Sequence, residues 1–137
     1  MVIWTSVWVG LGSNLGDSVA CFGDVLDAFL KNTAMRSLRV SPYYRTSPVG
    51  PQDQPDFLNA CVMFETYYTP KELWGFCRKL ELESGRRRRG KWGPRELDLD
   101  ILIFGDLVID DFELCIPHPE MDQRLFVLQP LMDLDPD

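Results

Sequence analysis

Residues 57–85 read FLNACVMFETYYTPKELWGFCRKLELESG, and they decide the fold because a strand signal runs directly into a helix signal. The first eight residues predict a strand with two usable faces. One face carries Leu58, Ala60, Val62 and Phe64, and the other carries Phe57, Asn59, Cys61 and Met63. Thr69 then predicts a helix start, since Pro70 suits the first helical position and Glu72 can bond back to the cap. The apolar face of that helix is predicted to be buried and consists of Leu73, Phe76, Cys77 and Leu80. Gly85 is predicted to end the helix.

The flanking segments repeat the same alternation of element types. Residues 1–9 predict a first strand, and a 3.6-residue pattern predicts a helix that ends near Asn32. Its apolar face is Leu15, Val19, Phe22, Leu26, Phe29 and Leu30. A second strand is expected over 38–44 and a fourth from Asp98 to Phe104. The order βαββαβ predicts an α+β fold, a ferredoxin-like sandwich with helices packed on one face of a mainly antiparallel sheet.

Length and composition favour one globular domain over residues 1–137. The net charge of −7 and the pI near 4.6 give little electrostatic reason to bind membranes or nucleic acid. The apolar start of the chain is too short to span a bilayer and lacks a basic leader. Four cysteines without a Cys-x-x-Cys pair predict small buried thiols and a cytoplasmic location. We expect a monomer.

Residues 86–100, RRRRGKWGPRELDLD, place a dense cationic segment directly before two carboxylates. Eight of the fourteen Lys and Arg residues fall between Arg78 and Arg95, although the whole chain is acidic. Asp98 and Asp100 are two apart on a predicted strand and therefore face the same way. Paired carboxylates that fill only part of a cation's shell suit Mg²⁺, which takes other oxygens from water and phosphates. The segment therefore predicts a site for phosphates and Mg²⁺.

Simpler explanations compete for each motif. A basic run is most often a solvated face or a nucleic-acid patch, and an Asp-x-Asp pair is often only a strand end. Two carboxylates beside the basic run would weaken a nucleic-acid patch, whereas a metal-nucleotide site needs them. Residues 10–17, GLGSNLGD, match neither glycine-rich nucleotide motif, so we interpret them as a structural turn with Ser13 or Asn14 capping the helix. His118 is held between two prolines, which suits a phosphate or ribose contact better than a metal site.

Two further function classes share some of these features. A ferredoxin-like sheet with exposed aromatics and basic loops can bind single-stranded RNA, but the aromatic RNA-binding strand motif is absent from the sequence. A nucleotide-sugar transferase could use Asp-x-Asp for its metal, yet the chain is small for separate donor and acceptor domains.

Several segments together resemble the 6-hydroxymethyl-7,8-dihydropterin pyrophosphokinase family. They are GSNLGD at 12–17, Tyr44-x-Thr46-x-Pro48-x-Gly50, DQPDFLN at 53–59, GPRELDLD at 93–100, IPHP at 116–119 and Arg124-x-Phe126. The resemblance implies transfer of diphosphate from MgATP to the pterin hydroxymethyl group, with release of AMP. It also implies ATP and 6-hydroxymethyl-7,8-dihydropterin as the small-molecule partners, and two Mg²⁺ ions as cofactors.

The same resemblance assigns roles to individual positions. Asp98 and Asp100 would hold the metal ions and, with Arg86 and Arg95, form the catalytic set. The nucleotide and its phosphates would be bound by Arg88, Arg95, His118 and Arg124. The pterin would be bound by Thr46, Val49, Gly50, Phe57, Asn59, Trp92 and Phe126, with Trp92 in a lid. Phe57 and Asn59 share a strand face, so they can supply a stacking ring and an in-plane amide.

Two departures from the family pattern stand out. Glu120 occupies a position where the family often has a basic residue, which affects one outer nucleotide contact. The sequence ends at Asp137, whereas relatives usually continue through a further C-terminal segment. Two alternatives follow: a domain that is naturally short, or one that is truncated before this segment.

Overall fold

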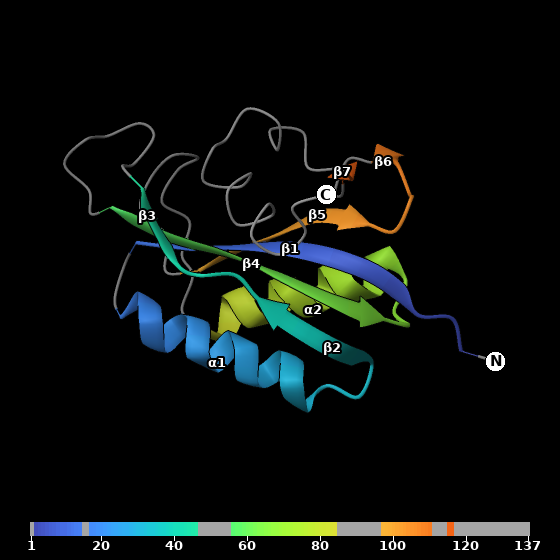
Figure 1. Ribbon diagram of the computed structural model, residues 1–137, viewed down its shortest axis with the longest axis horizontal. Helices are drawn as coiled ribbons and strands as arrows, with labels where there is room; N and C mark the ends of the chain where they lie inside the picture. The colour runs from blue at the N-terminus through green and yellow to red at the C-terminus, as the bar shows by residue number, and fades with distance from the viewer. Residues whose placement is uncertain (1, 15–16, 47–55, 85–96, 111–114, 117–137) are drawn as a thin grey trace.

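The computed structural model describes residues 2–14, 17–46, 56–84, 97–110 and 115–116. The elements are β1 (Thr5–Ser13), α1 (Ser18–Lys31), β2 (Met35–Val40), β3 (Tyr44–Thr46), β4 (Phe57–Thr66), α2 (Pro70–Glu83), β5 (Asp98–Phe104), β6 (Ile109–Asp110) and β7 (Cys115–Ile116). The main sheet has the order β2–β4–β1–β5, with β3 also paired to β4, and all its pairings are antiparallel. Both helices lie on one side of this sheet (Figure 1). The predicted α+β sandwich is confirmed.

The two helices begin at well-formed caps. Thr69 accepts a hydrogen bond from the Glu72 amide, and the Glu72 carboxylate accepts one from the Thr69 amide, so the predicted capping box is confirmed. In α1 the cap is Asp17, whose carboxylate accepts from the Ala20 amide at 3.0 Å. The prediction that Ser13 or Asn14 caps this helix is wrong, because β1 continues as far as Ser13.

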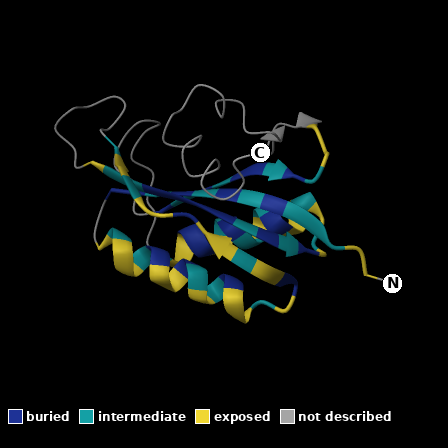
Figure 2. Cartoon of the chain, in the orientation of Figure 1, coloured by how far each residue is buried: buried dark blue, intermediate teal, exposed yellow. Residues whose placement is uncertain are grey.

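The main core lies between the helices and the sheet face that they cover. The rings of Phe29 and Phe64 join helix to sheet, with centroids 5.1 Å apart. Figure 2 shows the buried residues along the strands and on parts of both helices, while other parts of the helices are exposed. The core includes Val7, Val9, Leu11, Phe22, Val25, Phe29, Val62, Phe64, Leu73, Cys77, Leu97 and Leu99.

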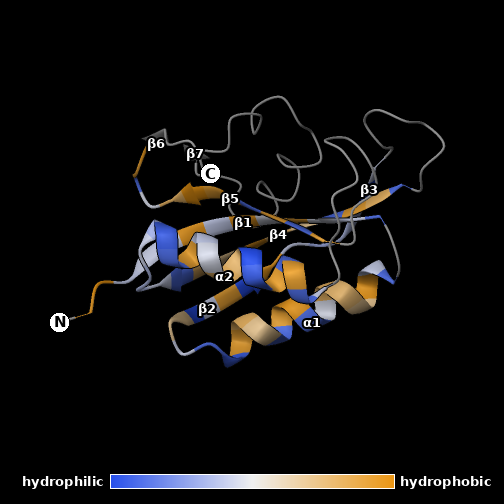
Figure 3. Cartoon of the chain, turned by 180° about the vertical axis from the view of Figure 1, so that it is seen from behind, coloured by the Kyte–Doolittle hydropathy of each residue, from blue (hydrophilic) through white to orange (hydrophobic). Residues whose placement is uncertain are grey.

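The predicted apolar face of α1 is partly wrong. Phe22 and Phe29 are buried as expected, but Val19 is 61% exposed and Leu30 is 68% exposed. Val25 takes the buried place between the two phenylalanines. Figure 3 shows the resulting mixture of apolar and polar residues on the helices, seen from behind. Within the described residues, no helix is long and apolar enough to cross a membrane.

The predicted second strand is in fact two short strands, β2 and β3. Both pair with β4 on the side away from β1, with β2 opposite its end and β3 opposite its beginning. The pairing of β2 is irregular between Arg36 and Arg39, where Ser37 has a φ of 58°. A small β6–β7 hairpin that the sequence pattern did not predict pairs Ile109 with Ile116.

Candidate active site

The strand register brings the predicted carboxylates and the predicted amide onto the sheet face opposite the helices. One row across the strands runs from Asp98 through Gly12 to Asn59 and ends at Tyr44. Residues in register across a sheet share a face, and neighbouring strands lie about 4.8 Å apart. Asp98 and Asn59 are therefore two strand spacings apart, on the order of 10 Å.

A second row lies beside the first, and it also has a glycine at its centre. Asp100 pairs with Gly10, which pairs in turn with Cys61. Because β5 alternates, Asp98 and Asp100 are partly exposed on this face while Leu99 between them is fully buried in the core. The prediction that the two carboxylates face the same way on a strand is confirmed.

Gly12 gives this face a floor without a side chain between Asp98 and Asn59. A Cβ at Gly12 would lie 3.5 Å from the side-chain oxygen Oδ1 of Asn59. At Gly10 the Leu102 side chain already packs on the backbone, because a Cβ there would lie 3.4 Å from a Leu102 methyl group. Both glycines lie within β1. The prediction that residues 10–17 form a structural turn is therefore wrong for Gly10 and Gly12. Their spacing of two within an apolar segment is the sequence signal for two positions on one strand face that carry no side chain of their own.

The amide of Asn59 is held in place by β3. Its Nδ2 donates a hydrogen bond of 2.7 Å to Thr46 Oγ1, and only 4% of Asn59 is exposed. Phe57 is partly exposed two residues earlier on the same strand, and it pairs in register with Thr46. The structure therefore brings together three residues expected to bind the pterin.

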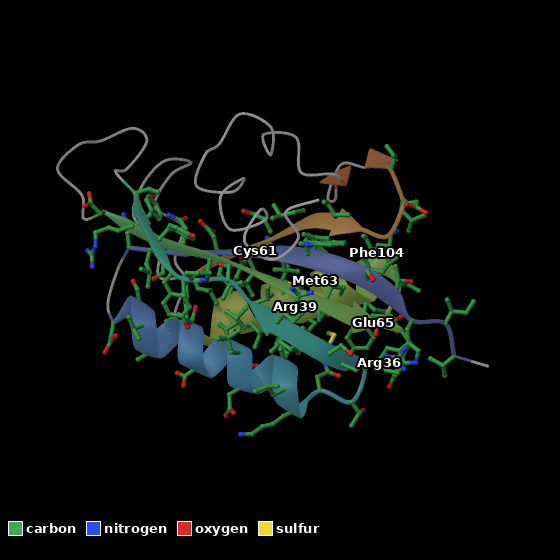
Figure 4. The ribbon with its side chains drawn as sticks, in the orientation of Figure 1. Arg36, Arg39, Cys61, Met63, Glu65 and Phe104 are labelled. Carbon is green, nitrogen blue, oxygen red and sulfur yellow. The ribbon has the colours of Figure 1, made fainter. Side chains whose placement is uncertain are left out.

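A small apolar cluster adjoins the second row. Cys61 and Leu102 are buried there, with Trp8, Met63 and Ile103 packed against them. Figure 4 labels Cys61 and Met63 along the middle of the sheet. Burial raises the pKa of the Cys61 thiol to about 12, so it stays protonated near neutral pH and is a poor nucleophile.

The structure describes Thr46, Phe57, Asn59, Asp98 and Asp100 of the expected site. The others lie outside the described residues: Val49, Gly50, Arg86, Arg88, Trp92, Arg95, His118, Arg124 and Phe126. No group of three or more His, Cys, Asp or Glu side chains within the described ranges could hold a metal ion. The two carboxylates are the hard oxygen donors that Mg²⁺ prefers, and they fit an ion that takes its remaining ligands from other groups.

Comparisons with known proteins identify the family of this chain. The family model described as 7,8-dihydro-6-hydroxymethylpterin-pyrophosphokinase matches residues 8–136. The 2-amino-4-hydroxy-6-hydroxymethyldihydropteridine pyrophosphokinase of Pseudomonas aeruginosa is 46% identical over 131 residues, which cover 96% of this chain and 81% of that protein. The protein of the same name from Bacillus subtilis is 41% identical over 127 residues, covering 93% of this chain and 76% of its own length.

A longer relative shows the same region inside a larger protein. The folic acid synthesis protein of Schizosaccharomyces pombe is 40% identical over 130 residues, which are 95% of this chain and 18% of that protein. The family match covers most of the sequence, and the relatives are similar over nearly the whole chain. The chain belongs to the 7,8-dihydro-6-hydroxymethylpterin-pyrophosphokinase family.

Proposed function

We propose that the protein transfers diphosphate from ATP to the hydroxymethyl group of 6-hydroxymethyl-7,8-dihydropterin and releases AMP, a step in folate biosynthesis. The family match supports this transferase activity. The observation that carries the proposal for the site is the shared sheet face, with two carboxylates on β5, an amide on β4 and two glycines between them. Such a face can hold a phosphate donor beside a flat acceptor.

Asp98 and Asp100 are the residues that would hold Mg²⁺, because they present carboxylate oxygens on one face of β5. When bound, Mg²⁺ would neutralise charge on the phosphate oxygens and help to orient the triphosphate. The chain's own contribution is to hold both carboxylates on one face of a strand, with Gly12 leaving room beside Asp98.

The acceptor side is built from Asn59, Thr46 and Phe57. A pterin is a flat heterocycle with hydrogen-bonding groups on its edge, so it needs an aromatic face and polar groups in its plane. Phe57 can supply the aromatic ring. The Thr46 hydroxyl accepts a hydrogen bond from the Asn59 amide and so orients it, and the oriented amide can then form hydrogen bonds with the edge of the pterin. Phe126 and Trp92 would supply the remaining aromatic contacts, with backbone at Val49 and Gly50.

The reaction requires alignment and charge stabilisation more than covalent help from the protein. The hydroxymethyl oxygen bonds to the β-phosphorus, and the bond from that phosphorus to the α–β bridging oxygen breaks. The bridging oxygen leaves with AMP, and the hydroxyl proton passes to solvent. Arg86 and Arg95 would stabilise the charge that develops on the bridging oxygen, since guanidinium groups stay ionised and bind phosphate with two donors. Arg88, His118 and Arg124 would hold the nucleotide.

The proposal extends to the setting of the enzyme. We expect a monomer that acts on small molecules in the cytoplasm, without a nucleic-acid or membrane partner. Buried thiols at Cys61 and Cys77 support a reducing compartment.

The test is to incubate the protein with ATP, Mg²⁺ and 6-hydroxymethyl-7,8-dihydropterin and to separate the nucleotides by chromatography. We expect AMP and a pterin diphosphate in equal amounts. ADP in place of AMP would mean phosphoryl transfer instead, and no turnover of the pterin would contradict the proposed acceptor.

A further inference from the structure

The backbone of Leu99 is held by two charged side chains of α2. The Leu99 amide donates a hydrogen bond of 2.8 Å to Glu81 Oε2. The Leu99 carbonyl oxygen accepts a hydrogen bond from Arg78 Nη2. Both backbone groups of the residue between Asp98 and Asp100 are therefore bonded to the helix behind the sheet.

This contact occupies the place of a neighbouring strand. Within the described sheet, β5 is an edge strand, paired with β1 alone. In an antiparallel pair, every second residue directs its N–H and C=O away from the partner strand, and those groups need other partners when buried. Leu99 is fully buried, so α2 supplies the donor and the acceptor that an additional strand would otherwise provide.

Glu81 is an unusual residue for this position. It lies on the buried side of α2 beside Leu80, and only 2% of it is exposed. Its Oε1 lies 3.2 Å from Arg78 Nε, an ion-pair contact without the alignment of a hydrogen bond. The Arg78 guanidinium also lies over the Trp74 ring, 5.6 Å from its centroid.

Stability alone does not account for a buried ion pair. The desolvation of two charges often cancels their attraction, and apolar residues of similar volume are frequently at least as stable. A directional contact, by contrast, fixes the position of the backbone that it binds. Here that backbone connects the two carboxylates of the proposed metal site.

We propose that Glu81 and Arg78 are positioning residues that hold β5 so that Asp98 and Asp100 present their carboxylates together. This inference rests on the proposed function, because it assigns the pair a role through the metal-binding carboxylates. Residues that orient metal ligands commonly change metal affinity when they are substituted, even without touching the ion. The same pair also keeps the charge of Glu81 neutralised behind the strand, next to Arg78.

The test measures Mn²⁺ binding by electron paramagnetic resonance, in the presence of a non-hydrolysable ATP analogue with a methylene group between the α and β phosphorus atoms. We compare the unmodified protein with Glu81→Ala, Glu81→Gln and Asp98→Asn. The matched control is Glu83→Ala, because Glu83 lies on the same helix in an exposed ion pair with Lys79, at 3.8 Å. Circular dichroism verifies that each variant is folded, and amide hydrogen exchange at Leu99 reports the backbone contact.

Glu81→Ala should weaken Mn²⁺ binding about tenfold or more and speed exchange of the Leu99 amide, as for other residues that support metal ligands. Glu81→Gln keeps an acceptor but loses its charge, so its effect should lie between those of the unmodified protein and Glu81→Ala. Glu83→Ala should match the unmodified protein. If Glu81→Ala does not fold, the positioning role is tested with Glu81→Gln alone, by its Mn²⁺ affinity and by the exchange rate of its Leu99 amide.

Faster exchange at Leu99 in a folded Glu81 variant, with unchanged Mn²⁺ binding, would overturn the positioning role. If Asp98→Asn weakens Mn²⁺ binding in that case, the proposed metal site survives and only the positioning role fails. If Asp98→Asn also leaves Mn²⁺ binding unchanged, the proposed metal site itself is wrong.

Discussion

Asp98 and Asp100 combine a rigid backbone with partial exposure, as metal-binding carboxylates require. Replacing either with Asn keeps the size of the side chain but removes the charge. We expect each folded variant to lose about 10³-fold or more in turnover, since loss of a metal contact removes several kcal/mol of transition-state stabilisation. AMP release at saturating Mg²⁺ measures this effect.

The control for this pair is Asp106→Asn. Asp106 is exposed just beyond the end of β5, so its substitution should leave turnover unchanged. Near-normal turnover in either Asp98→Asn or Asp100→Asn would contradict the metal assignment.

Asn59 donates a hydrogen bond to Thr46 and is also predicted to bind the pterin. A buried amide on an apolar strand needs a hydrogen-bond partner, and the structure supplies Thr46 as one. We expect Asn59→Ala to weaken pterin binding about tenfold or more while nearly preserving ATP affinity, because the amide lies on the acceptor side of the face. Thr46→Val should weaken pterin binding less, because it removes only the group that orients the amide.

Titration calorimetry with each ligand separates these effects. A loss of affinity that is equal for ATP and pterin would mean that Asn59 serves the fold and not the pocket.

At the scale of elements, the clearest prediction concerns the glycines of β1. Gly12 lies between Asp98 and Asn59 in the register, and a Cβ there makes only an ordinary contact with the side-chain oxygen Oδ1 of Asn59. Gly12→Val should therefore fold but place a branched side chain on the floor between donor and acceptor. We expect a fall of about tenfold or more in kcat/KM, comparable with the loss of an aligned substrate.

Gly23→Ala in α1 is the control, since a Cβ there meets nothing within 4 Å. It should keep full activity and stabilise the protein by roughly 0.5–1 kcal/mol, because alanine favours the helix. Full activity in a folded Gly12→Val variant would show that substrate does not occupy this floor.

Elements with strong local signals were predicted well from the sequence, and elements fixed by distant partners were not. The cap at Thr69 and the strand from Asp98 depend on neighbouring residues, so local chemistry suffices to place them. The separation of β2 from β3 depends on pairing with β4, far along the chain. The extension of β1 beyond Val9 likewise depends on distant partners, because residues 10–12 pair with both β4 and β5 and Ser13 pairs with β4.

For the molecule as a whole, the sheet separates the main core from the proposed site. One face packs against α1 and α2, and the other carries the carboxylates, the amide and the glycine floor. The sequence indicated which residues are chemically suited to the site, but their common face follows from a register that joins β1, β4 and β5. Local sequence patterns likewise could not predict the contact of Glu81 with Leu99. It is a hydrogen bond between a side chain of α2 and the backbone of β5, so it depends on how the two elements pack.

The two buried thiols predict how the stability of the whole molecule depends on alkaline pH. Burial raises the pKa of both Cys61 and Cys77 from 9.0 to about 12. Below pH 9 both states keep the proton, so the stability is fully present, whereas between about pH 9 and 12 only the unfolded state ionises. The free energy of unfolding should therefore fall by roughly 1 kcal/mol per pH unit for each thiol in that window.

Urea unfolding from about pH 8 to about pH 10.5 measures this slope in the unmodified protein and in Cys61→Ala. Other titrating groups are common to both proteins, so the difference between the slopes isolates one thiol. The variant is expected to be less stable at pH 8, because it loses buried volume, but its stability should fall less steeply above pH 9. Parallel slopes would mean that the Cys61 thiol ionises as readily in the folded protein as in the unfolded chain, and the apolar cluster around it would then be open to water.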